Sequence, residues 1–234
     1  ALKATRRQKR VALASLMVEL PMSNLWERLL LPAFVYFFRL LYPFALANDP
    51  HSRVAAAAGG CVLMETREIQ NLGGFDALRG ALIDDCTLAR LVKLGGGGTW
   101  IGLTRRARSQ RRYPRLADIW GMVARTAFTQ LRHSVLLLGL CTVLMVIAFI
   151  VPVAGIAGPD GPTALAAAVA LAAMTASYLP TIRYYRRQPL WALTLPAAGV
   201  LFLAMTWTSA CRYWWGRGAY WRGRAYGAGG GTEI

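Results

Sequence analysis

Two adjacent carboxylates, Asp84 and Asp85, are the residues of this 234-residue chain best suited to acid–base chemistry. No other two acidic residues are neighbours, and Leu88, Leu91 and Val92 follow them with the spacing of one helix face. A carboxylate at a helix N-terminus is kept ionised by the helix dipole, and an ionised carboxylate can accept a proton from a hydroxyl group. A carboxylate there can also simply cap the helix. The spacing alone leaves both interpretations open, a general base or a structural cap.

The segments around this pair alternate between strand-like and helix-like patterns, which indicates α/β layers. Within the second expected strand stand Gly59 and Gly60, where the missing side chains would let a substrate approach the backbone closely. The expected segments are a strand or helix at 11–20, a buried strand at 54–64, a helix at 65–72 closed by Gly73–Gly74, a helix at 81–94 and a short strand at 99–103.

The second half of the chain is a membrane region. Hydrophobic residues make up 56% and charged residues 16%, against about 25% charged in soluble domains, which excludes a fully soluble or a disordered protein. After Arg132 come three charge-free stretches, each of which is long enough for a helix that crosses the hydrocarbon core. We expect these apolar segments at about 135–155, 164–180 and 190–210.

Two other segments suit a membrane surface. Residues 24–46 are very apolar but carry Glu27, Arg28 and Arg39, so they predict one or two helices that lie on the membrane without crossing it. A buried helix of a soluble domain is the alternative. Residues 105–115 hold six arginines, which suit anionic headgroups or substrate phosphates. Nucleic-acid binding is not expected, because Tyr113 is the only aromatic residue interleaved with them.

The sequence around the acidic pair, GGFDALRGALIDDCTLARLVKLGGGGTWIGL, resembles the acceptor-side half of membrane glycosyltransferases of family 2. In that family a GGF turn precedes an ED-x-x-L motif whose second acid is the catalytic base. The resemblance therefore implies that Asp85 is the base and that Asp84 replaces the glutamate. The segments WERLLLPAFVYFF and SQRRYPRLADIWGMVARTAFTQLRHS are similar to the hopene-associated glycosyltransferase type.

Further substrate-binding residues are implied by the same resemblance. Processive members carry a Q-x-x-R-W motif, which aligns best with Thr129–His133: Arg132 matches its arginine, whereas Thr129 and His133 replace its glutamine and tryptophan. Arg132 would pair with a diphosphate, because guanidinium matches phosphate oxygens; the alternative is a juxtamembrane anchor. His133 would contact the acceptor, or is a plain interfacial histidine. The remaining candidates are Gln130, from the same stretch, and Trp221 and Arg224, from an ending WRGRAY similar to WKGR-x-Y.

The family binds its nucleotide sugar and a divalent metal through a D-x-D motif, and this chain contains no D-x-D. We therefore expect the chain to be the C-terminal portion of a longer enzyme. Mg²⁺ or Mn²⁺ is expected for the full enzyme, with its ligand motif outside this chain. The four cysteines show no paired spacing, so no metal site is expected from them.

The expected fold class is α/β, a partial GT-A-like glycosyltransferase domain followed by an α-helical transmembrane region. The resemblance implies an inverting enzyme of a bacterial-type inner membrane, with its catalytic part in the cytoplasm. It would move a sugar from a nucleotide sugar to a lipid acceptor, possibly a hopanoid. A non-catalytic membrane-anchoring and interaction module is the alternative. The expected parts are the catalytic portion (1–115), an interfacial helix (116–134), the transmembrane region (135–210) and a basic tail (211–234).

The tail poses a topological conflict. Arginines at 212–224 favour the cytoplasmic side by the positive-inside rule, but three complete spans would place the tail outside. A re-entrant hairpin in 190–210, with its turn at Pro196 and Gly199, would resolve the conflict. A simple third span is the alternative.

Overall fold

The computed structural model describes residues 3, 11–158, 160–216, 219–221 and 224–226. By their contacts they form two compact units: one spans 1–21 and 37–112, and the other spans 22–36 and 113–234. Much of the predicted basic tail lies outside the described residues.

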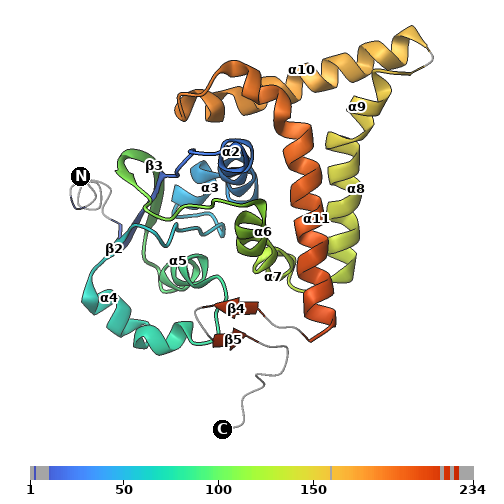
Figure 1. Cartoon of the computed structure of the whole chain (residues 1–234). Helices are drawn as coiled ribbons and strands as arrows, with labels where there is room; N and C mark the ends of the chain where they lie inside the picture. Colours follow the sequence, from blue (N-terminus) through green and yellow to red (C-terminus); the bar gives the residue numbers. More distant parts are fainter. Residues whose placement is uncertain (1–2, 4–10, 159, 217–218, 222–223, 227–234) are drawn as a thin grey trace. The chain divides into compact units, whose positions relative to one another are not determined.

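A three-stranded mixed sheet forms the centre of the first unit (Figure 1). Its order is β2-β1-β3, with β1 antiparallel to β2 and parallel to β3. The segment 11–20, which fitted a strand or a helix, is therefore a strand. β3 is longer than the predicted 99–103, because it continues through the first arginines of the basic stretch to Arg108, whose Nε lies 2.6 Å from an oxygen of Glu19. The bounds are β1 (Leu13–Glu19), β2 (Val62–Met64) and β3 (Thr99–Arg108).

The helices of this unit follow the predicted pattern closely. Gly73 and Gly74 have φ angles of +88° and +73°, which favour glycine and close α4 where the sequence predicted a stop. α5 buries Ala89 and Val92 against Leu13 of β1. The bounds are α3 (Phe44–Asn48), α4 (Thr66–Asn71), the 3-10 helix η1 (Gly74–Leu78) and α5 (Asp84–Leu94).

Residues 54–60, which we call the alanine segment, correct one prediction. Only β2 of the predicted strand 54–64 is a strand, although Ala55, Ala56 and Ala57 are buried. The reason is that side chains satisfy the backbone here. The Ser15 hydroxyl accepts the Ala58 N–H (2.7 Å) and lies 3.1 Å from the Ala58 carbonyl, to which it donates.

The second unit is helical apart from a short two-stranded ribbon. The predicted surface helices at 24–46 are two, α2 and α3, and α2 runs from the second unit into the first. The predicted single helix at 116–134 is interrupted after Ala124 and becomes α6 and α7. The bounds are α2 (Leu25–Leu41), α6 (Leu116–Ala124), α7 (Ala127–Gln130), α8 (Val135–Phe149), α9 (Val151–Gly155), α10 (Gly161–Tyr184), the 3-10 helix η2 (Pro189–Thr194), α11 (Leu195–Trp214), β4 (Ala219–Trp221) and β5 (Arg224–Tyr226).

The start of α2 explains a charge in an apolar segment. Glu27 is fully buried, and its carboxylate accepts the N–H groups of Ser23 and Tyr113, each at 2.7 Å. Asn24 accepts the Glu27 N–H at 3.0 Å, so the two side chains cap the helix much as a capping box does. Further along α2, Tyr36 shares a hydrogen bond of 2.8 Å with Ser177 of α10. Glu27 is therefore a structural carboxylate, and placement of α2 on a membrane stays a prediction.

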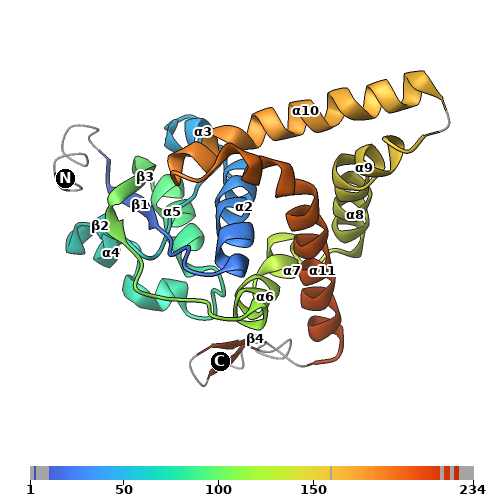
Figure 2. The ribbon, with the colours of Figure 1, turned by 45° about the horizontal axis from the view of Figure 1, so that its top comes forward.

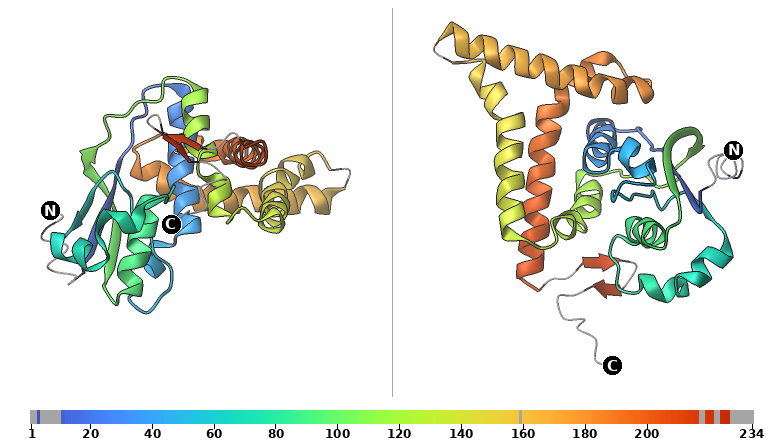
Figure 3. Two further views of the ribbon diagram at one scale, coloured as in Figure 1. Left: turned by 90° about the horizontal axis from the view of Figure 1, so that it is seen from below. Right: turned by 180° about the vertical axis from the view of Figure 1, so that it is seen from behind.

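Three helical stretches are long and apolar enough to cross a membrane: Val135–Gly155, Gly161–Tyr184 and Pro189–Trp214. They do not form a bundle of three neighbours. Figure 2 and the view from behind in Figure 3 show α8 and α11 side by side, with α10 lying across their ends.

The re-entrant hairpin predicted within 190–210 is wrong, because α11 is one continuous helix from Leu195 to Trp214. Pro196 lies in its first turn, where proline costs no helical hydrogen bond. Gly199 lies against α8, since a Cβ atom there would stand 2.6 Å from Cγ of Phe149. The glycine that we placed in a turn therefore allows two helices to approach closely.

Candidate active site

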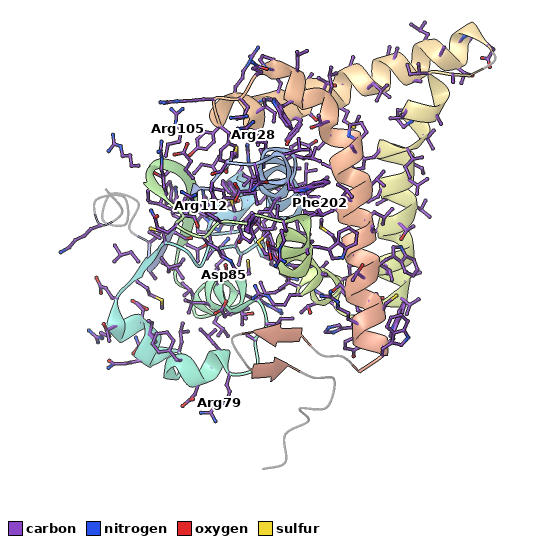
Figure 4. The ribbon with its side chains drawn as sticks, in the orientation of Figure 1. Arg28, Arg79, Asp85, Arg105, Arg112 and Phe202 are labelled. Carbon is purple, nitrogen blue, oxygen red and sulfur yellow. The ribbon has the colours of Figure 1, made fainter. Side chains whose placement is uncertain are left out.

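Asp85 binds two parts of the first unit at once. It lies in the first turn of α5, as predicted, and Figure 4 labels it there. Its Oδ2 accepts the Gly59 N–H and its Oδ1 accepts the Cys86 N–H, both at 2.8 Å. Asp84 is exposed and accepts only the N–H of Asp85, at 3.0 Å. The two acids therefore differ: Asp85 is half-buried and joined to the alanine segment, whereas Asp84 faces solvent.

Opposing effects set the basicity of Asp85. Burial raises the pKa of Asp85, the N–H groups of Gly59 and Cys86 lower it, and the Asp84 charge raises it again, with a raised pKa as the result. A raised pKa makes a carboxylate a stronger base, and a general base works best when its pKa approaches the operating pH. Burial also raises the pKa of the Cys86 thiol to about 12, so this cysteine is a neutral thiol beside the carboxylate.

The two glycines of the alanine segment have different surroundings. A Cβ atom on Gly59 would stand 3.2 Å from Oδ2 and 3.3 Å from Cβ of Asp85. A Cβ atom on Gly60 would have only Val18 Cγ2 as a neighbour, at 3.9 Å. Both glycines are exposed. Gly59 thus supports the carboxylate, and Gly60 is open to a ligand.

A strained turn holds the second group of predicted site residues. Arg132 and His133 have φ angles of +53° and +55°, a left-handed conformation that costs residues with side chains about 1–2 kcal/mol each. Consecutive residues of this kind are rare, and such strain is concentrated at functional sites. Both side chains are exposed, in the turn between α7 and α8.

Aromatic contacts fix the imidazole of this turn. The His133 ring stacks on Tyr213 of α11 with ring centroids 4.2 Å apart and planes 14° apart. Phe128 meets the same ring edge-on at 5.4 Å, and the Thr129 hydroxyl lies 3.3 Å from His133 Nε2. Burial lowers the pKa of His133, so the neutral imidazole is favoured at pH 7. Gln130 ends α7 close by in the sequence and is half-buried.

Apart from Trp221 and Arg224, the predicted site residues thus form two groups. Gly59, Gly60, Asp84 and Asp85 belong to the first unit, and Gln130, Arg132 and His133 belong to one turn of the second. Trp221 and Arg224 are opposite each other in the β4–β5 ribbon of the second unit.

Sequence reasoning missed the residues that support each group. Ser15 and Lys93 hold the alanine segment through its backbone, and Tyr213 supports His133. Their partners are distant in the sequence, so neither period nor spacing could indicate them. A lysine near the end of an otherwise ordinary helix was the only visible signal for Lys93.

A divalent metal does not fit the described residues by themselves. Within this part of the chain no three His, Cys, Asp or Glu side chains gather closely enough to hold an ion. Both carboxylate oxygens of Asp85 already accept backbone N–H groups. No catalytic step is therefore assigned to a metal here.

Comparison with known proteins gives one match. A family model described as glycosyl transferase family 21 matches residues 15–234. The match supports a transferase, and it does not support the more specific family 2 assignment that the motifs suggested. No curated protein and no solved structure matched the chain.

Proposed function

The chain belongs to glycosyltransferase family 21, and we propose that it forms the acceptor side of a membrane-bound, inverting glycosyltransferase with a GT-A-like fold. The donor is a nucleotide sugar and the acceptor is the hydroxyl group of a membrane lipid. Asp85 is the general base. The observation that carries this assignment is the half-buried Asp85 carboxylate, which is fixed by Gly59 and Cys86 and has a raised pKa.

The proposed reaction is a single displacement. Asp85 takes the proton of the acceptor hydroxyl as its oxygen forms a bond to the anomeric carbon of the donor. The bond from that carbon to the nucleoside diphosphate breaks on the opposite face, and the diphosphate leaves with the bonding electrons. For Arg132, in the second unit, we propose separately that it binds phosphate, because a guanidinium ion binds phosphate oxygens through two parallel hydrogen bonds. The exposed side chain and strained backbone of Arg132 support this role.

The acceptor is assigned from chemistry and from resemblance. The helices long and apolar enough to span a membrane support a lipid as the acceptor, because lipids would surround them there. The similarity of residues 109–134 to the hopene-associated type favours a hopanoid over a glycerolipid. We assign the cytoplasmic face of a bacterial-type inner membrane to the catalytic part, because 20 of the 27 basic residues precede His133.

Asp85→Asn in the full-length protein tests the base. We expect transfer to fall at least about a hundredfold, because an amide cannot accept the proton, an effect typical of a lost general base. Folding should be maintained, because an amide oxygen can still accept one backbone N–H group. The measurement is the transfer of radiolabel from a panel of nucleotide sugars to hopanoid and glycerolipid acceptors in reconstituted membranes.

Two matched variants control this experiment. Asp84→Asn should reduce transfer less, and Asp76→Asn should leave it near wild type, because Asp76 is an exposed partner of Arg79 on η1. Near wild-type transfer by Asp85→Asn would remove it from the role of base. Absence of transfer by the wild type with every donor would favour the anchoring module instead.

A further inference from the structure

We propose that Lys93 is a positioning residue for Asp85: its ammonium group binds the main-chain carbonyls that lead into the alanine segment and so holds the Gly59 N–H against the carboxylate. The catalytic consequence rests on the function proposed above. The contact between the lysine and the loop does not, and it can be tested without activity.

The ammonium group of Lys93 is surrounded by backbone oxygens of α3 and of the loop that follows α3 up to Val54. Nζ lies 2.6 Å from the carbonyl oxygen of Val54, 2.9 Å from that of Asp49 and 3.1 Å from that of Ser52. The Leu46 carbonyl is a fourth acceptor, at 3.4 Å. An ammonium group has three N–H donors and no acceptor, so this half-buried side chain uses its full capacity on one stretch of backbone.

Charge makes these contacts stronger than neutral hydrogen bonds. Burial lowers the pKa of Lys93, and the Asp49 carboxylate opposes this shift. The carbonyl oxygens also favour the charged form, because they accept hydrogen bonds from it. Without the cation, several carbonyl dipoles would point toward the same space with no donor between them, and the loop would move to find water.

The loop and the catalytic residue are coupled through α5. Lys93 stands eight residues after Asp85, about 12 Å along the helix axis. The loop ends at Val54, and the alanine segment continues from there to Gly59, whose N–H meets Asp85 at 2.8 Å. Between these ends Ser15 binds Ala58. The same helix therefore holds the segment at both ends, with the cation at one and the carboxylate at the other.

The test is Lys93→Ala in the full-length protein, with chemical rescue. The truncation removes the equivalent of n-propylammonium and leaves the carbonyls in place. We expect hydrogen exchange in a peptide covering residues 54–60 to become at least about fivefold faster. We expect kcat to fall about tenfold, with KM for the nucleotide sugar changed less than about threefold, as for lost orientation rather than lost binding. Millimolar n-propylammonium should restore both, and neutral n-propanol should restore neither.

Arg90→Ala is the matched control, because it removes an exposed cation from the same helix. It should change neither exchange nor kcat. If Lys93→Ala does not accumulate, Lys93→Gln keeps N–H donors without the charge and should show intermediate exchange that propylammonium does not alter. Unchanged hydrogen exchange in residues 54–60 of Lys93→Ala would show that Lys93 does not hold the alanine segment. Faster exchange with unchanged kcat, in a wild type that is active, would overturn the positioning role. Exchange can be read even where no transfer is found, so failure of the proposed function is recognised separately.

Discussion

The contact between Gly59 and Asp85 makes the catalytic carboxylate sensitive to a single methyl group. In Gly59→Ala, the added Cβ atom would stand 3.2 Å from Asp85 Oδ2, so the carboxylate would have to shift by a few tenths of an ångström. Displaced reactive groups can cost up to a hundredfold in rate, so we expect kcat to fall about 10–100-fold with little change in stability. The measurement is steady-state transfer, together with the melting temperature.

Gly60→Ala is the matched control for this prediction. Gly60 is exposed, as Gly59 is, and a Cβ atom added to it would have only Val18 Cγ2 as a neighbour within 4 Å, at 3.9 Å. The two variants therefore differ in the contact to Asp85 rather than in exposure. Equal losses in both would indicate that the segment binds substrate through both glycines, and equal retention would show that Asp85 tolerates the shift.

The sequence located the acid, Asp85, but not the residues that bind it. Asp85 was predictable, because an acidic pair at a helix start is visible in the letters and matches a family motif. Its bond to Gly59 was not, because 26 residues separate them and only the folded alanine segment brings the N–H to the carboxylate. The strain at Arg132 and His133 was also invisible, since most arginines and histidines have negative φ, although histidine is enriched among the exceptions.

Close packing of α8 and α11 depends on Gly199 of α11. Gly199→Ala would place a Cβ atom 2.6–3.0 Å from the Phe149 ring. Overpacking of this kind costs about 1–3 kcal/mol. Because Gly199 and Gly139 both lie inside helices and gain the same helix propensity, we expect Gly199→Ala to melt about 2–12 °C below Gly139→Ala in detergent, given the usual shift per kcal/mol for chains of this size.

Gly139→Ala supplies the comparison. A Cβ atom on Gly139, in α8, has nothing within 4 Å. That change adds only helix propensity, about 1 kcal/mol in favour of the fold, so its melting temperature should not fall. If the melting temperature changes in neither Gly199→Ala nor Gly139→Ala, the Phe149 ring moves away from position 199 without loss of stability.

Elements were predicted best where a local signal exists. α4 and α5 begin or end at glycines and acids that act within one turn, and those predictions hold. The strand predicted at 54–64 failed over residues 54–61, and the hairpin predicted within 190–210 failed completely, for one shared reason. Each was read from a local pattern, but the outcome was set by a distant partner, Ser15 in one case and Phe149 in the other.

Contact between the two ends of the apolar region constrains the topology of the whole chain. His133 precedes α8 and Tyr213 lies near the end of α11, and their rings stack. Residues in ring contact lie on one side of a membrane, so an even number of crossings must separate them. Three single crossings are therefore inconsistent with this contact. α10 is the helix that lies across the other two (Figure 3).

We accordingly predict an even number of crossings between His133 and Tyr213, with the C-terminal tail on the same side as Arg132. A green fluorescent protein fused after Ile234 should fluoresce, and alkaline phosphatase at the same place should be inactive. Phosphatase fused after Gly158, beyond the first crossing, should be active. By the same reasoning, the hydrogen bond between Tyr36 and Ser177 puts the C-terminal half of α10 on the side of α2. An active phosphatase after Ile234 would restore three crossings and contradict the ring contact.

The parallel pairing of β1 with β3 also has a consequence for how the protein is made. β1 ends at Glu19 and β3 starts at Thr99, so its parallel partner is missing until about 80 more residues have left the ribosome. At bacterial or eukaryotic elongation rates of about 5–20 residues per second, that delay lasts roughly 4–16 s. During this delay the apolar helix α2 has emerged but the sheet is incomplete, so we expect newly made chains to expose apolar surface and to need a chaperone or a membrane surface to cover it.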